Sequence, residues 1–206
     1  MTITDICELT GSKYKIFIDE EFAFVLYKGE LRQFGIKIGE EISEEEYCMI
    51  TGEVLTKRAK LRAMHLLEKK PYTEMALRTK LSENFYSESI IDATIDYLKG
   101  FGYIDDCAYA TQYLETYSDS KSVRKMEMEL RQKGITADIF DKAYETCEAL
   151  GELTDEHVLV AKLLDKKHFG ESEPDEQTIA KVANYLYGKG FSSEIIREEM
   201  KKKMNL

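Results

Sequence analysis

The chain of 206 residues carries 39 acidic and 29 basic side chains, which gives a formal net charge of −10. Hydrophobic residues make up 43% and aromatic residues 11% of it, a composition typical of a folded globular protein and not of a disordered chain. The negative charge argues against a protein whose whole surface binds nucleic acid, and no run of about 18 apolar residues is present to span a membrane.

Residues 1–42 are predicted to form a small β segment. Residues 14–18 and 22–27 are rich in β-branched and aromatic side chains, and the polar run 19–21 between them is typical of a hairpin. A third strand is expected at 34–38, where apolar and polar side chains alternate. Residues 1–56 hold 12 acidic and 5 basic side chains, so we do not expect this part to bind DNA.

A connecting helix is expected over residues 43–56. Ser43 and Glu46 have the spacing of a capping box, in which each side chain bonds to the backbone N–H of the other residue. Gly52 leaves open whether this helix is continuous or is a broken pair. A basic stretch, Lys57 to Arg62, follows it.

A sequence motif of eleven residues occurs three times, and its copies begin at Leu81, Leu130 and Leu186. Each copy predicts a helix, a tight turn and a second helix. Gly134 and Gly190 are expected to end the first helix with a positive φ, and Asn84 to do so in the first copy. The side-chain oxygens of three residues are expected to cap the second helix: Ser87, Thr136 and Ser192.

Repetition at this period predicts stacked helical units. Further breaks at Pro71, at 99–102 and near residues 117–122, 149–154 and 170–174 give three helices in each unit. We therefore expect a mainly α protein with three tandem three-helix repeats, at 57–104, 105–151 and 154–206, preceded by the β segment. Such a stack makes an elongated, curved body.

Three stretches of the chain resemble the RecX family, regulators of the RecA recombinase. Residues 58–67 with 73–81 are similar to the family's opening helix pair. Residues 98–106 with Ala108, Tyr109 and Ala110 resemble its most recognisable segment, and residues 129–135 its second hallmark. The resemblance implies a regulator that binds the RecA–single-stranded-DNA filament, lies in its groove and lowers its ATPase, strand-exchange and co-protease activities, in DNA repair and SOS control.

Two groups of residues are candidates for partner contact. The first is predicted to meet the RecA filament and consists of Tyr103, Asp106, Arg124, Arg131 and Lys133. Arg124 and Arg131 are seven residues apart, about two helical turns, and so share one face. The second group is a patch for DNA or a second partner surface and consists of Arg58, Arg62, Arg78 and Lys80. Capping by Asp106 and solvated basic faces are the structural alternatives for these residues.

No enzyme is expected, because the sequence has no glycine-rich phosphate loop, no Gly-x-Ser-x-Gly motif and no histidine beside a nucleophile with a supporting acid. No cofactor or metal is expected either, since four scattered cysteines and three histidines lack ligand spacing. Free, buried thiols favour the reducing cytoplasm. We expect a monomer without membrane contact that binds single- or double-stranded DNA weakly at most.

An alternative function is a stand-alone DNA-binding module. Helices joined by tight turns resemble helix-turn-helix geometry, and residues 57–105 carry 9 basic and 7 acidic side chains. Salt-dependent binding of naked DNA would distinguish this function from filament regulation.

Overall fold

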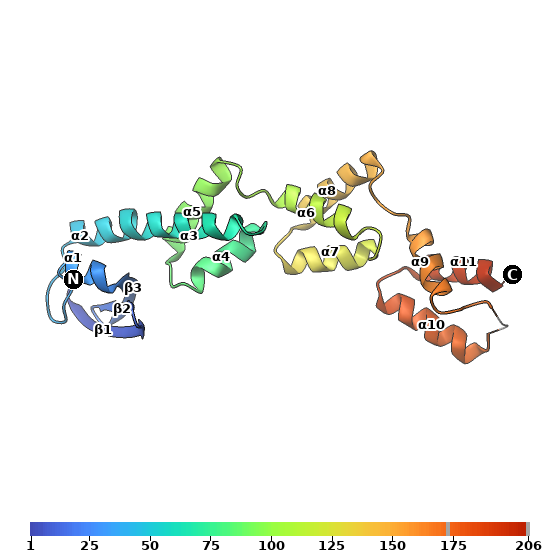
Figure 1. The fold of residues 1–206 in the computed structure, drawn as a ribbon, viewed down its shortest axis with the longest axis horizontal. Helices are drawn as coiled ribbons and strands as arrows, with labels where there is room; N and C mark the ends of the chain where they lie inside the picture. Colours follow the sequence, from blue (N-terminus) through green and yellow to red (C-terminus); the bar gives the residue numbers. More distant parts are fainter. Residues whose placement is uncertain (172–173, 205–206) are drawn as a thin grey trace. The chain divides into compact units, whose positions relative to one another are not determined.

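The computed structural model describes residues 1–171 and 174–204, and the chain divides into two compact units, Met1–Asp105 and Asp106–Leu206. The first unit contains a sheet and three-helix repeat 1, and the second contains repeats 2 and 3 (Figure 1). None of the described helices has the length and apolar character needed to cross a bilayer.

The N-terminal sheet has three antiparallel strands in chain order: β1 (Ile3–Thr10), β2 (Lys13–Ile18) and β3 (Glu21–Tyr27). The predicted hairpin is confirmed as β2 and β3, and their two-residue turn has positive φ at Asp19 and Glu20. The prediction of a third strand at 34–38 is wrong, because β1 pairs with the free edge of β2. Residues 34–36 instead end α1 (Lys28–Gln33), where the Ile36 N–H bonds to the Leu31 carbonyl.

A helical run leads from the sheet into repeat 1. It comprises α2 (Glu44–Cys48), the π-helical segment η1 (Met49–Leu55) and α3 (Thr56–Leu67). The capping box of Ser43 and Glu46 is confirmed, with the Ser43 hydroxyl accepting from the Glu46 N–H. Gly52 lies inside η1. The helical run is therefore not broken at this glycine but changes there to wider π-helical turns.

Each repeat contains three helices within the described residues, and the mainly α fold is thus confirmed (Figure 1). Repeat 1 has α3, α4 (Glu74–Ser82) and α5 (Glu88–Gly100). Repeat 2 has α6 (Asp106–Tyr117), α7 (Val123–Gln132) and α8 (Ala137–Leu150). Repeat 3 has α9 (Glu156–Asp165), α10 (Glu176–Gly188) and α11 (Ser193–Met204).

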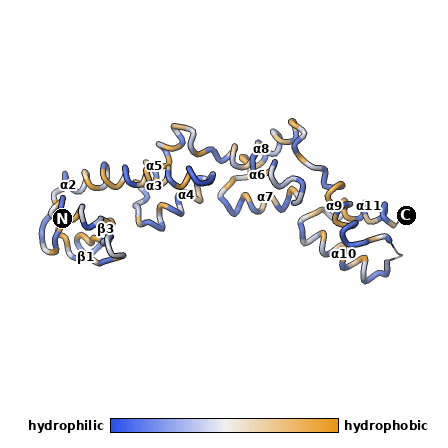
Figure 2. Tube along the Cα trace, viewed as in Figure 1, coloured by the Kyte–Doolittle hydropathy of each residue, from blue (hydrophilic) through white to orange (hydrophobic). Residues whose placement is uncertain are grey.

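Each repeat buries its own apolar cluster, and hydrophobic and hydrophilic residues alternate along the helices accordingly (Figure 2). In the first unit, Ile16 and Leu26 of the sheet belong to the same buried cluster as Leu81 and Ile95 of the helices. The N-terminal sheet therefore packs against repeat 1 and shares its core.

The turn of the repeated motif is confirmed at Gly134 and Gly190, where φ is 90° and 94°. The prediction for Asn84 is wrong, because the left-handed residue of the first copy is Phe85, with φ 64°. In all three copies the N–H five residues after the leading leucine bonds back to that leucine's carbonyl. This bond requires the turn at the fourth residue, which is Phe85 in the first copy.

The three predicted N-cap residues occupy their positions, but their side chains differ. Ser192 accepts a hydrogen bond from the Ile195 N–H at 3.3 Å. Ser87 and Thr136 have extended cap backbones without a side-chain cap bond, so that part of the prediction is wrong. The Ser87 hydroxyl lies 3.1 Å from the Ser89 hydroxyl, and the Thr136 side chain bonds to Asp138 and lowers the pKa of that carboxyl.

Candidate interaction surfaces

The outward face of α7 carries two of the predicted contact residues. Arg124 is exposed and has no salt bridge within the described part of the chain. The Arg131 side chain is 70% exposed, and its nearest acidic partner, Glu127, is 4.0 Å away. Met128 lies between them in sequence and is 46% exposed. Spacings of four and three residues put Arg124, Met128 and Arg131, hereafter the α7 face, on one side of the helix.

The opposite side of α7 is held firmly in repeat 2. Met126 and Leu130 are buried in its core. Glu129 accepts from Lys121 at 2.6 Å and from the Tyr113 hydroxyl. The hydrogen bond from Lys121, followed by that from Tyr113, lowers the pKa of the Glu129 carboxyl. These contacts fix α7 against α6 and the loop before α7, so the α7 face has a rigid support.

Lys133 and Asp106 lie in less open positions than the two arginines. Lys133 is the C-cap residue of α7 and is half-buried, with its N–H bonded to the Leu130 carbonyl. Asp106 is half-buried in the first turn of α6, where the helix dipole favours a carboxylate. Partner contact by these two residues stays a prediction.

Tyr103 belongs to a group of exposed aromatic side chains in repeat 1. Tyr97, Phe101 and Tyr103 are 36%, 65% and 51% exposed. The ring centroids of Tyr97 and Phe101 are 4.8 Å apart, and those of Phe101 and Tyr103 are 6.2 Å apart and stacked. The Lys60 ammonium lies 4.2 Å from the Tyr97 ring centroid. We call these three rings the aromatic cluster; it offers flat apolar surface beside a positive charge.

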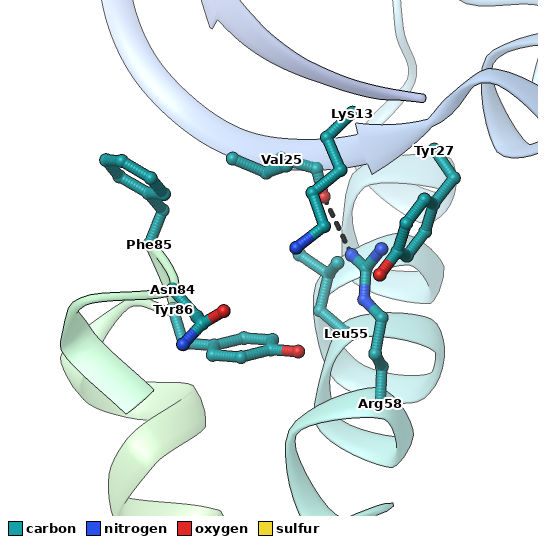
Figure 3. Close-up of a pocket in the computed structure, with 8 residues that line it drawn as sticks. All are labelled: Lys13, Val25, Tyr27, Leu55, Arg58, Asn84, Phe85 and Tyr86. Atoms are coloured by element: carbon teal, nitrogen blue, oxygen red, sulfur yellow. Dashed lines mark hydrogen bonds between the residues drawn. The ribbon is translucent and has the colours of Figure 1, made fainter. Parts of the chain in front are cut away.

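Arg58 of the second predicted group joins α3 to the sheet (Figure 3). Its Nη2 donates to the Val25 carbonyl at 2.7 Å, and its Nη1 lies 3.1 Å from a Glu30 carboxylate oxygen. The guanidinium is also 4.8 Å from the centroid of the Tyr27 ring, and the side chain is only 20% exposed. These contacts orient Arg58 toward its own fold.

Intramolecular pairing also engages Arg78 and Lys80. Arg78 bonds to Glu74 at 2.9 Å and to Asp92 at 2.7 Å, and these bonds raise the pKa of its guanidinium. Lys80 pairs with Glu83 at 2.8 Å. Arg62 is exposed and has no salt bridge to any described residue. The four residues thus differ in availability, and their contact with DNA stays a prediction.

The four cysteines are free thiols, but the prediction that they are buried is wrong for two of them. Cys147 is buried and Cys107 half-buried, whereas Cys7 and Cys48 are exposed. Cys147 lies with Glu115 and Glu152, all with potential metal-binding atoms within 4.8 Å of one another. A side-chain hydrogen bond with Glu115 raises the pKa of the Glu152 carboxyl.

Met128, Tyr97 and Phe101 were missing from the sequence-based site. Met128 is the apolar residue between two arginines on one helical face, a pattern that a helical projection reveals. Tyr97 and Phe101 are four residues apart, so they meet at the end of α5. The exposure of Phe101 depends on the turn after α5 and could not be predicted from spacing alone.

Sequence models of three RecX domains match the chain in order. They are described as the first, second and third three-helix domains of RecX, and they match residues 59–98, 105–143 and 155–200. These ranges coincide with the three helical repeats of the structure, and the second and third begin one residue before α6 and α9.

Curated relatives match along nearly the whole chain. Regulatory protein RecX of Caldanaerobacter subterraneus subsp. tengcongensis is 31% identical over 92% of this chain and 93% of its own. The protein of that name from Clostridium beijerinckii is 28% identical over 99% of this chain and 95% of its own.

Solved structures show the same fold. A crystal structure of regulatory protein RecX has a TM-score of 0.63 at 28% identity, covering 96% of this chain and 98% of that one. RecX from Lactobacillus salivarius has a TM-score of 0.63 at 21% identity, over 74% of this chain and 99% of that one.

Proposed function

This chain belongs to the RecX family, and on that premise we propose that it binds the RecA–single-stranded-DNA filament and inhibits its ATPase, strand-exchange and co-protease activities. The proposal makes it a non-enzymatic regulator of recombination and of the SOS response, acting in the cytoplasm. The relatives' name, regulatory protein RecX, supports a regulatory role.

The α7 face is the observation that best supports a protein partner. It presents Arg124, which has no salt bridge to a described residue, and Arg131, whose pair with Glu127 is 4.0 Å long, with the exposed Met128 between them. Arginine and methionine are enriched in protein interfaces, because both combine apolar area with adaptable contacts. An acidic surface on the filament would complement this face, even though the whole chain is negatively charged.

Binding to the assembled filament is the experiment that tests this proposal. The probe is fluorescein-labelled single-stranded DNA coated with RecA and a non-hydrolysable ATP analogue. We expect this chain to raise the anisotropy of the coated DNA, and Arg124→Ala/Met128→Ala/Arg131→Ala to weaken binding at least about tenfold, because interface residues of this kind contribute about 1–2 kcal/mol each.

The matched control is Lys142→Ala, which removes an exposed cation from α8 of the same repeat. This control should bind the coated DNA like the unchanged chain. Unchanged binding by the triple variant would remove the α7 face from the proposal, and no binding by the unchanged chain would contradict filament binding itself.

The aromatic cluster favours a second candidate function, direct binding of single-stranded DNA. Bases stack on exposed aromatic rings whatever their sequence, and a nearby cation such as Lys60 adds attraction to phosphate. Arg62 and Lys57 are further exposed cations of the same repeat. Under this function, naked single-stranded DNA binds with an affinity that falls steeply with salt, and Phe101→Ser with Tyr103→Ser weakens it.

A further inference from the structure

Helices α10 and α11 of repeat 3 border an open groove with a volume of about 400 Å³. Asn184 and Ser193 are its neutral polar lining residues, and most of the lining is apolar: Ile179, Ala183, Tyr187, Ile196, Met200 and Met204. Tyr187 is 58% exposed, whereas Ile196 and Met200 are buried. Neither predicted surface includes these residues, so the groove is a separate feature of the molecule.

The cations of α11 divide into two pairs. Lys202 bonds to the buried Glu199, and Lys203 bonds to Asp165 of α9. Arg197 and Lys201 are exposed, and within the described residues neither has a salt bridge. These two cations are the ones that line the groove, one helical turn apart, and the described lining contains no carboxylate.

We propose that this groove binds an amphipathic helical segment of a protein partner, with apolar side chains in the groove and carboxylates paired with Arg197 and Lys201. An amphipathic helix buries its apolar stripe when it lies in a groove between two helices. Carboxylates three or four residues apart on such a helix match cations that are one turn apart. Charge complementarity then selects acidic partners over basic ones.

The chemistry of the lining favours a polypeptide over a nucleic acid. Isoleucine and methionine side chains offer dispersion contacts but no hydrogen bonds to phosphate or base edges. Tyr187 is the one aromatic residue among the described lining residues, too few for a run of stacked bases. The proposal does not depend on the proposed function, because it concerns repeat 3 alone.

A panel of three fluorescein-labelled helical peptides tests the proposal on the full chain. The peptides share one leucine ridge and carry glutamate, glutamine or lysine along its flanks. Fluorescence anisotropy should show the tightest binding for the glutamate peptide and the weakest for the lysine peptide. The ranking should reverse for Arg197→Glu/Lys201→Glu, with a loss of at least about tenfold for the glutamate peptide.

Two further variants separate the groove from general charge effects. Lys181→Glu changes an exposed cation of α10 that is outside the groove lining, and it should preserve the ranking. Tyr187→Ser removes exposed apolar area and should weaken all three peptides. Circular dichroism verifies the fold of each variant, which is expected to hold because the substituted side chains are exposed.

Several results would overturn the proposal. They are the absence of saturable binding by all three peptides, equal affinity for all three, and an unchanged ranking for Arg197→Glu/Lys201→Glu. A single-stranded oligonucleotide that displaces the glutamate peptide would assign the two cations to phosphate instead. Self-association that Tyr187→Ser abolishes in sedimentation would assign the groove to a second copy of the chain.

Discussion

The Ser122 hydroxyl donates a hydrogen bond to the Lys189 carbonyl, with 2.8 Å between the two oxygens. Ser122 is buried at the N-cap of α7, and the same hydroxyl accepts from the Lys125 N–H. Lys189 precedes Gly190, the left-handed residue that turns α10 toward α11. The turn of repeat 3 therefore contacts the start of the helix that carries the α7 face, and repeats 2 and 3 are joined at this point.

Replacement of Gly190 by alanine should destabilise this junction. A Cβ there would lie 2.5 Å from the Ser122 Oγ, and φ is 94°. The strained backbone costs about 1–2 kcal/mol and the steric clash about 1–3 kcal/mol more. Urea unfolding followed by circular dichroism measures the loss.

Gly151→Ala is the matched control for Gly190→Ala. Gly151 has φ 72°, but no atom of the described residues lies within 4 Å of an added Cβ, so only the backbone strain applies. Equal destabilisation by the two substitutions would show that the clash between the added Cβ and the Ser122 hydroxyl does not lower the stability.

Arg58→Ala should loosen the sheet from repeat 1. The substitution removes the bonds to Val25 and Glu30, a loss of about 1–3 kcal/mol, although the Glu30 carboxylate keeps its bond from the Tyr27 N–H. Hydrogen–deuterium exchange should show faster exchange in β2 and β3. Arg62→Ala, on the exposed side of the same helix, is expected to change the free energy of unfolding by less than about 0.5 kcal/mol. A comparable effect from both variants would contradict the structural role of Arg58.

Phe85 should reverse the usual preference for alanine over glycine. Its φ of 64° costs an alanine about 1–2 kcal/mol and a glycine nothing, so Phe85→Gly should be more stable than Phe85→Ala. Both variants lose the contacts with Phe22 and Lys15, which cancel in the comparison. At Asn84, where φ is not positive, glycine should give no advantage. Thermal unfolding of Phe85→Gly, Phe85→Ala, Asn84→Gly and Asn84→Ala tests which residue makes the turn.

Acid should destabilise repeat 3 through Glu199. The hydrogen bond from Lys202, aided by His157, lowers the pKa of this buried carboxyl below its ordinary 4.5. A carboxyl whose pKa is lower in the folded protein than in the unfolded chain stabilises the fold at pH values above the unfolded-state pKa. This contribution is lost as the pH falls through the folded-state pKa. The loss is thus expected below pH 4.5, with Glu198 and Asp155 as further acids near the same cluster.

Glu199→Gln isolates this contribution. The variant should be less stable than the unchanged chain at pH 7, and the difference should shrink as the pH falls below 4.5. Midpoints of thermal unfolding across this range measure it. A difference that stays constant with pH would contradict the ionised pairing of Glu199.

The sequence predicted the architecture because its signals are local. Residues a few positions apart determine the Ser43–Glu46 capping box, the hairpin and the glycine turns of the repeated motif. The pairing of β1 with β2 could not be predicted in this way, since it depends on which segment reaches the open edge of β2. The left-handed Phe85 was missed because asparagine adopts a positive φ more readily than phenylalanine, whereas the bond from the Tyr86 N–H to the Leu81 carbonyl requires the turn at residue 85.

The candidate site was less predictable than the fold, because exposure and pairing are tertiary properties. Spacing placed Arg124 and Arg131 on one helical face, and both are exposed. The density of positive charge along the sequence grouped Arg58 with Arg62, although only the structure distinguishes the arginine that holds the sheet from the one that faces solvent. Charge counts along a sequence thus identify basic segments but not available cations.

The ATPase rate of RecA on single-stranded DNA, titrated with this chain at substoichiometric ratios, tests the central claim most directly. We expect the rate to fall with the unchanged chain and with Lys142→Ala, and to fall much less with Arg124→Ala/Met128→Ala/Arg131→Ala. An unchanged rate with folded protein and its cognate recombinase would contradict filament regulation and favour direct DNA binding.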